Sequence, residues 1–386
     1  MKKISLLILL TLTVSLFAFL PVFASDSVST GAQLSLEADS AYLIEATTGT
    51  VLYSKNEVSA ASPASVTKIM TLLLVAEALE EGRFALEDTV SISAHAASMG
   101  GSQVFLEEGE RIGVEDLIKC AVIASANDAA VALAELVAGS ESAFVSKMNM
   151  RASELGLVNT NFENATGLDD TTTRHYSCAA DIALMSRELI NHEIILKYSS
   201  LWQDTIRNGE FTLTNTNRLV RYYDGCNGLK TGSTDKAGYC LSATAKRGNM
   251  QLIAVVMGAD SRDARNAAAR ELLDYGFANY ALYEDGAGTL EGVPVFSGVE
   301  SEVAVGSRGF SYVIDKSKLS SVERVYEIPE NLNAPILEGD AVGRIIYKVD
   351  GAEIGYSEIV AEKSVEKITL LEIFARIITR IICFRG

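Results

Sequence analysis

The pattern of hydrophobic and polar positions changes several times along the chain, and each pattern predicts a different element. Two lysines precede a run over 4–23 that is apolar except for Ser and Thr. The run ends at a small-residue site typical of a secretory signal peptide, so we expect residues 1–24 to be removed and the protein to be exported. A retained anchor is the alternative, because the run approaches membrane-spanning length.

Strand and helix patterns alternate over 26–282. Residues 41–46 and 50–53 predict one β-hairpin, and residues 239–246 and 250–257 predict another. Strands at both ends of this region indicate an α+β domain whose sheet is closed by both halves of the chain. Between them, residues 66–80 are apolar on almost every side and predict a buried central helix. Further helices are predicted around 114–124, 127–138, 140–154, 178–191 and 262–275.

The last hundred residues show two further patterns. Short apolar segments separated by Gly, Ser, Asn and Asp over 286–360 predict a small β-sandwich domain. Residues 363–386 then predict an amphipathic helix with a broad apolar face, carrying five basic and two acidic residues. Such a helix is typical of one that lies in a membrane interface, and its charge suits an anionic surface. A helix packed on the protein's own core is the alternative.

Composition narrows the function classes. The 386 residues are 48% hydrophobic and carry a net charge of −17, which excludes a mostly disordered chain and disfavours nucleic acid as a partner. Only three histidines are present, and none has the spacing of a catalytic or zinc motif, so each is interpreted as structural or surface. The five cysteines suggest no zinc site. A bridge between Cys226 and Cys240 is possible, but spacing cannot establish it. No metal or cofactor is called for.

Three short motifs carry the candidate chemistry. They are Ser65-Val66-Thr67-Lys68 at the start of the buried helix, Ser125-Ala126-Asn127 between two helices, and Lys230-Thr231-Gly232 near the late hairpin. Residues three apart share one face of a helix, so Lys68 can reach Ser65. A buried lysine near positive charge favours the neutral amine, which can activate a serine nucleophile.

Each motif is weak by itself. Ser364-Val365-Glu366-Lys367 also fits Ser-x-x-Lys, and Ser54-Lys55-Asn56 also fits Ser-x-Asn. The specific signal is the ordered triple in its expected context of helix start, inter-helix loop and sheet strand.

This triple resembles that of the serine D-alanyl-D-alanine carboxypeptidases, the low-molecular-mass penicillin-binding proteins. The resemblance extends to almost the whole chain, including the small β domain and the tail. It implies a penicillin-binding, β-lactamase-like transpeptidase domain, with an antiparallel sheet and a helical subdomain. The segments that carry it further are Pro63–Thr71, Gly228–Gly232 with Ala237-Gly238-Tyr239, and Asn164–Leu168 with His175-Tyr176-Ser177.

The resemblance also implies residue roles in the cleavage of peptidoglycan stem peptides. Ser65 would attack the penultimate D-alanine carbonyl and Lys68 would take its proton. Ser125 would relay a proton to the leaving amine, and Asn127 would hold the substrate amide and Lys68. Backbone N–H groups of Ser65 and Ser233 would form the oxyanion hole.

The remaining implied roles concern substrate binding. Lys230 and Thr231 would bind the terminal carboxylate, and Gly232 would let the substrate backbone approach the strand. Arg265 is a candidate second carboxylate ligand, with a surface ion-pair residue as its alternative. Many relatives carry an acidic residue where this chain has Asn227, which puts only local strand support in doubt. β-Lactams would act as covalent inhibitors at Ser65.

Two rival functions stay open at this point. A class A-like β-lactamase shares two of the motifs but needs a glutamate that activates water. Its Glu-x-x-Leu-Asn signature is absent, although Glu154 to Asn159 comes close. A non-catalytic, membrane-tethered wall-binding protein is the other, and the three intact motifs argue against it. The expected location is the outer face of the cytoplasmic membrane.

Overall fold

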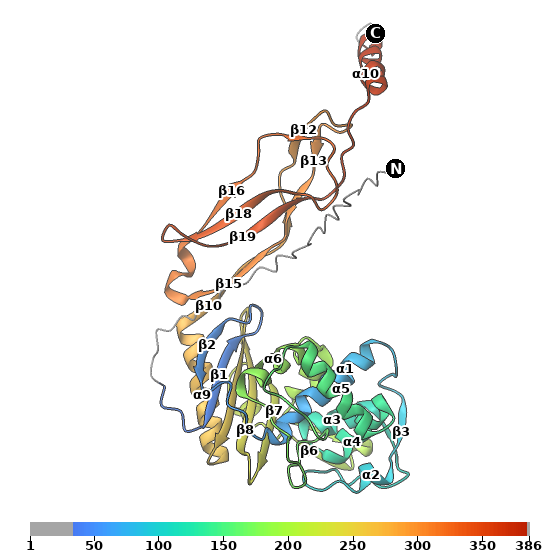
Figure 1. Cartoon of the computed structure of the whole chain (residues 1–386), viewed down its shortest axis with the longest axis vertical. Coiled ribbons are helices and arrows are strands. Elements are labelled where there is room, and N and C mark those ends of the chain that lie inside the picture. The colour runs from blue at the N-terminus through green and yellow to red at the C-terminus, as the bar shows by residue number, and fades with distance from the viewer. Residues whose placement is uncertain (1–33, 384–386) are drawn as a thin grey trace, which may run out of the picture.

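The computed structural model describes residues 34–383, and the expected signal peptide over 1–24 lies outside the described residues. An α+β domain forms one end of the elongated molecule. A smaller all-β domain and then a single helix extend away from it (Figure 1). The order of the parts agrees with the expected one.

Five antiparallel strands form the main sheet in the order β2-β1-β9-β8-β7. Strand β1 comes from the start of the domain but lies between β2 and β9, so both halves of the domain close the sheet as expected. The strands are β1 (Ser40–Glu45), β2 (Val51–Lys55), β7 (Cys226–Thr234), β8 (Gly238–Arg247) and β9 (Met250–Ala259).

Helices cover both faces of this sheet. One face packs against a helical subdomain, and the other packs against α9 (Arg262–Asn279) in a second apolar core (Figure 1). Strands β8 and β9 are therefore buried on both faces, which explains the almost continuous apolar sequence of β9. The other helices of this domain are α1 (Lys68–Glu80), α2 (Ala94–Ala97), α3 (Val114–Ile123), α4 (Asn127–Ala138), α5 (Glu141–Glu154), α6 (Ala179–Leu189), α7 (Glu193–Ser199) and α8 (Leu219–Tyr222). Two short strand pairs lie among them, β3 (Thr89–Ser91) with β4 (Arg111–Gly113) and β5 (Gln203–Ile206) with β6 (Phe211–Thr214).

The predicted central helix is α1, but it begins two residues later than its apolar pattern. A single 3₁₀ turn, η1 (Ala64–Thr67), precedes it. Ile69, Met70 and Leu73 of α1 are fully buried. Most of the helix is therefore packed against the core, which gives its N-terminal turn a rigid support.

The β domain is a sandwich with one shared core. A sheet in the order β11-β14-β19-β18-β16 and a small sheet in the order β13-β12-β17 both contribute to it. The chain stays in this domain past residue 360, because Val365 is buried and pairs with Ile336. The strands are β11 (Gly288–Thr289), β12 (Val293–Phe296), β13 (Glu302–Val303), β14 (Val305–Ser307), β16 (Val322–Glu327), β17 (Leu332–Asn333), β18 (Ala341–Val349) and β19 (Ala352–Ala361).

Two paired strands join the domains. β10 (Tyr280–Asp285) begins directly after α9 and pairs antiparallel with β15 (Phe310–Asp315) along its whole length. Leu282 belongs to the core beneath α9, whereas Tyr283 packs against the core of the β domain. Lys316, in the turn η3 (Lys316–Ser321), donates a hydrogen bond from Nζ to the Phe277 carbonyl of α9 at 3.0 Å. The junction is therefore part of both cores.

The terminal helix α10 (Leu370–Cys383) makes little contact with the rest of the chain. Its apolar side chains are exposed, among them Leu371, Phe374 and Ile382. Among the described helices, none is by itself long and apolar enough to cross a bilayer, and α4 with α5 meets that test only as a pair bent by 81°. Cys226 and Cys240 are both free thiols, so the possible bridge between them is not formed.

Candidate active site

The first motif lies at the N-terminal end of α1. Ser65 belongs to η1, where Ala64 adopts a left-handed backbone conformation with φ of 47°. Lys68 is the first residue of α1 and is fully buried, and its Nζ lies 3.0 Å from Oγ of Ser65. The spacing of three residues therefore brings the two side chains into contact, as the sequence predicted.

Besides its contact with Ser65, the Lys68 amine has two hydrogen-bond acceptors. Its Nζ lies 2.5 Å from Oδ1 of Asn127 and 2.8 Å from the carbonyl oxygen of Thr166. Burial, followed by the charge of Lys230, holds the pKa of Lys68 well below its usual range, and the Asp128 carboxylate opposes this shift. The neutral amine needed for a general base is thus favoured.

The second motif lies between α3 and α4. Ser125 is buried and has a left-handed backbone with φ of 62°, and its Oγ accepts a hydrogen bond from Nζ of Lys230 at 2.7 Å. Asn127 begins α4, and its Nδ2 donates to the Gly100 carbonyl at 2.7 Å. The other N–H of that amide has no acceptor among the residues that the structure describes.

A buried carboxylate supports this motif. Asp128 accepts hydrogen bonds from the backbone N–H groups of Val104, Leu106 and Ala129. It thereby holds the loop over 100–106 against the start of α4.

The third motif lies on β7, an edge strand of the main sheet. Lys230 is buried, and its Nζ donates to Ser125 and to the Thr231 carbonyl at 2.9 Å. Burial and then the charge of Arg265 lower the pKa of Lys230 to about 7. Near neutral pH this amine is therefore divided between its charged and neutral forms.

The next two residues of β7 lie close to the first motif. Thr231 donates from Oγ1 to Oγ1 of Thr216 at 2.7 Å. A Cβ on Gly232 would lie 2.8 Å from the Pro63 carbonyl oxygen and 2.9 Å from the Ser65 nitrogen. Glycine is therefore required for β7 to pack against η1, a reason that the sequence did not reveal.

Arg265 lies on α9 and is 3% exposed, so it is no surface ion-pair residue. Its guanidinium donates to Oδ1 of Asn266 and to the Cys240 carbonyl, and no carboxylate within 34–383 forms an ion pair with it. Burial lowers its pKa to about 10, which leaves it cationic at neutral pH. Ser233, by contrast, is exposed at the end of β7, opposite Tyr239.

The site thus combines a serine in contact with a buried lysine, a second serine bound to a second lysine, and a buried arginine. Within the described residues, no group of three His, Cys, Asp or Glu side chains is arranged to hold a metal ion.

Comparison with known proteins shows what the chain is similar to. A family model described as D-alanyl-D-alanine carboxypeptidase matches residues 27–261. The D-alanyl-D-alanine carboxypeptidase DacF of Bacillus subtilis (strain 168) is 43% identical over 371 residues, which cover 94% of this chain and 95% of that protein.

The chain belongs to the D-alanyl-D-alanine carboxypeptidase family. It is accordingly a serine-type D-Ala-D-Ala carboxypeptidase, as the motifs predicted. A second model, for the C-terminal domain of penicillin-binding protein 5, matches residues 277–367 and covers the β domain.

Solved structures agree with this assignment. Penicillin-binding protein 5 from Haemophilus influenzae is 32% identical with a TM-score of 0.76, covering 87% of this chain and all of that one. Penicillin-binding protein D2 from Listeria monocytogenes, in an ampicillin-bound form, is 31% identical with a TM-score of 0.59. That match covers 64% of this carboxypeptidase and all of the Listeria chain. The expected fold class is therefore confirmed.

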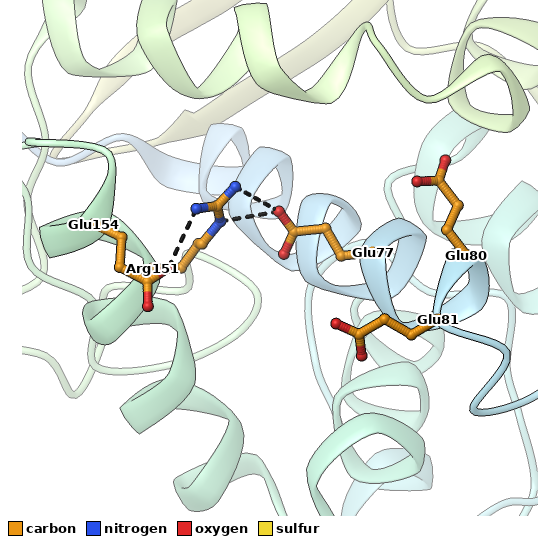
Figure 2. Close-up of a pocket in the computed structure, with 5 residues that line it drawn as sticks. All are labelled: Glu77, Glu80, Glu81, Arg151 and Glu154. Carbon is orange, nitrogen blue, oxygen red and sulfur yellow. Dashed lines mark hydrogen bonds and ion pairs between the residues drawn. The ribbon is translucent and has the colours of Figure 1, made fainter.

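The rival β-lactamase interpretation requires a glutamate that activates water near Ser65, and the candidate for that glutamate, Glu154, lies elsewhere. Glu154 lies beside Arg151 in a surface pocket with Glu77, Glu80 and Glu81 (Figure 2). Glu77 is nine residues along α1 from Lys68, roughly 14 Å along the helix axis. Glu154 is held there by an ion pair with Arg151 at 3.2 Å, so it cannot activate water at Ser65.

Several contributors to the site of this carboxypeptidase were missed from sequence. Any residue type can supply a backbone carbonyl, so the side chain of Thr166 gave no indication of this contact. The only signal for it in the sequence was the resemblance over Asn164–Leu168. Thr216 lies in no motif. Asn227 proves to support the strand, because Thr244 of β8 donates from Oγ1 to its Oδ1 at 2.7 Å.

Proposed function

We propose that Ser65 is the nucleophile with which this carboxypeptidase removes the terminal D-alanine of peptidoglycan stem pentapeptides, thereby limiting their cross-linking. The observation that carries the proposal is the 3.0 Å contact between Oγ of Ser65 and the buried Nζ of Lys68. The neutral Lys68 amine takes the Ser65 proton as Oγ attacks the penultimate D-alanine carbonyl, which forms an acyl-enzyme.

Other groups of the site act on the leaving group and on the oxyanion. Ser125, bonded to Lys230, passes a proton to the amine of the departing D-alanine. Backbone N–H groups of Ser65 and Ser233 stabilise the oxyanion. The close packing of β7 against η1 at Gly232 supports this pairing, because it holds the strand beside the Ser65 nitrogen.

The terminal carboxylate of the substrate is bound by Lys230, Thr231 and Arg265. Two buried cations without a carboxylate partner among residues 34–383 support this assignment, since a buried charge is costly until an opposite charge joins it. Asn127 orients the substrate amide with its remaining N–H.

Water then releases the shortened peptide from Ser65. β-Lactams acylate the same serine, in line with the ampicillin-bound relative. Deacylation of the penicilloyl-enzyme is expected to be slow, because the near-match Glu154 is distant from Lys68.

The test is mass spectrometry of the penicillin adduct, with D-alanine release measured on the same preparation. Ser65→Ala should lose both the adduct and D-alanine release. Ser364→Ala is the matched control, because Ser364 and Lys367 repeat the motif spacing in the tail, and it should retain both.

Three outcomes would contradict the proposal. D-alanine release by Ser65→Ala would exclude the nucleophile, and rapid turnover of penicillin would favour a β-lactamase. A lack of D-alanine release by the unchanged protein would favour a wall-binding role.

The exported enzyme is held at the outer face of the cytoplasmic membrane by α10. The exposed apolar side chains of this helix support the proposal, since water is an unfavourable environment for them.

A further inference from the structure

The Lys68 amine requires two acceptors in fixed positions. As a neutral amine it has two N–H bonds and one lone pair. If the N–H bonds point at Oδ1 of Asn127 and the Thr166 carbonyl, the lone pair is left for the Ser65 proton. The position of the Thr166 carbonyl thus helps to aim the general base.

A tight turn presents that carbonyl. Oδ1 of Asn164 accepts hydrogen bonds from the backbone N–H groups of Thr166 and Gly167 at 3.1 and 2.7 Å. Gly167 has a left-handed backbone with φ of 84°, and a Cβ there would collide with the Ala64 carbonyl and approach Oγ1 of Thr67. The turn over 164–167 is therefore packed directly against η1.

His175 connects this turn to η1. Its ring is 2% exposed, and Nδ1 accepts the backbone N–H of Glu163 at 3.0 Å. Since Nδ1 then carries no proton, Nε2 carries one and donates it to Oγ1 of Thr67 at 2.8 Å. Glu163 directly precedes the turn, and Thr67 directly precedes Lys68.

The neutral state of the ring is favoured by its surroundings. Burial lowers the pKa of His175 to about 4, against the carboxylates of Glu163 and Asp169 and in the same direction as the charge of Lys236. The His175 and Phe162 rings also pack edge to face, with centroids 5.8 Å apart. The ring therefore stays neutral at neutral pH, and the N–H of Glu163 keeps the ring proton on Nε2.

We propose that His175 is a positioning residue for acyl transfer, whose two ring nitrogens lock the Thr166 carbonyl in register with Ser65 and Lys68. The inference rests on the proposed role of Ser65. A filler of the apolar pocket would need only the shape of the ring. Here both polar atoms are used, and each bonds a segment adjacent to a reacting group.

Three variants distinguish the contribution of Nδ1 of His175 from that of Nε2. In His175→Gln the amide nitrogen can reach the Nε2 position and keep the bond to Thr67. In His175→Asn the shorter side chain reaches only the Nδ1 position. Thr67→Val removes the hydroxyl with almost no change of shape. His192→Asn is the control, because His192 bonds Glu80 at the opposite end of α1.

The measurement is the rate constant for acylation of Ser65 by a fluorescent penicillin, separated from its dissociation constant. His175→Asn and Thr67→Val should slow acylation by roughly 10- to 100-fold, because small misplacements of reacting groups cost about this much. Binding should change little, and His175→Gln should recover part of the rate. The double variant that combines Thr67→Val with His175→Asn should be acylated no more slowly than Thr67→Val alone. Both substitutions remove the same hydrogen bond, so their effects should not add.

Two results would overturn the inference. One is acylation at the unchanged rate in folded Thr67→Val or His175→Asn, judged by thermal melting. The other is a His175→Gln variant no faster than His175→Asn. Nitrogen NMR of the imidazoles gives an activity-independent readout, in which His175 should show the Nε2–H tautomer and shift when Ser65 is acylated. A failure of the proposed nucleophile would appear separately, as D-alanine release by Ser65→Ala.

Discussion

Lys68 and Lys230 are both buried, but their neighbours differ in a way that suits the two roles proposed for them. Lys68 lies among neutral acceptors next to Ser65, where burial and a second cation favour the amine as a base. Lys230 bonds Ser125 and lies within the field of Arg265, where its protonated form can attract a carboxylate.

The pKa of about 7 for Lys230 predicts a pH dependence of substrate binding. Carboxylate binding uses the protonated amine, and the lowered pKa means that this form is lost as the pH rises through about 7. The KM for a D-Ala-D-Ala peptide should therefore increase between about pH 7 and 9, measured by D-alanine release.

A penicillin with its carboxylate esterified provides the control for this titration. The concentration of this ester that gives half-maximal acylation should not increase between about pH 7 and 9, because the ester presents no carboxylate to Lys230. Arg265 stays protonated over this range, since its pKa is about 10. A KM that is flat from pH 6 to 9 would contradict the role given to Lys230.

At the level of elements, the sequence predicted which side chains are buried and which of them meet. It did not predict the local backbone conformation or the backbone groups that contact those side chains. The apolar pattern over 66–80 indicated the burial of Lys68, and the three motifs indicated the residues that meet. The 3₁₀ turn before α1 and the Thr166 carbonyl were not predictable, because no residue type encodes them. Likewise, His175 has no motif spacing, and only its contacts connect it with Thr67.

Asp128 shows how one side chain supports an element of the site. Its carboxylate accepts backbone N–H groups from the loop over 100–106 and from α4. Asp128→Asn would turn an amide donor towards those N–H groups, so the free energy of unfolding should fall by about 1–3 kcal/mol. Urea denaturation measures this change.

Asp116→Asn is the matched control for that loss, because Asp116 also lies in the first turn of a helix but is only partly buried. Its effect should be within about 0.5 kcal/mol of zero. Equal stability of the two variants would show that the Asp128 bonds do not hold the loop.

At the level of the whole molecule, the β domain and α10 can be tested apart from catalysis. A chain ending after Ile368 keeps Val365 in the β-domain core but lacks α10. It should release D-alanine at the unchanged rate and stay in the supernatant when mixed with vesicles containing anionic lipid. The full mature chain should pellet with them.

Sedimentation of the shortened chain with vesicles would refute anchoring by α10. Loss of D-alanine release by this chain would instead show that α10 contributes to the catalytic domain. The second result would be unexpected, because the described part of α10 lies at the end of the molecule opposite that domain (Figure 1).

The strand pair β10 and β15 has a consequence for how the enzyme meets its substrate. Each strand belongs to both cores, so the junction transmits rotation as well as translation and does not act as a flexible tether. The catalytic domain should therefore move together with the β domain as one body, and not independently of it. The active site should then approach stem peptides in an orientation set by the β domain, and not by free rotation of the catalytic domain alone.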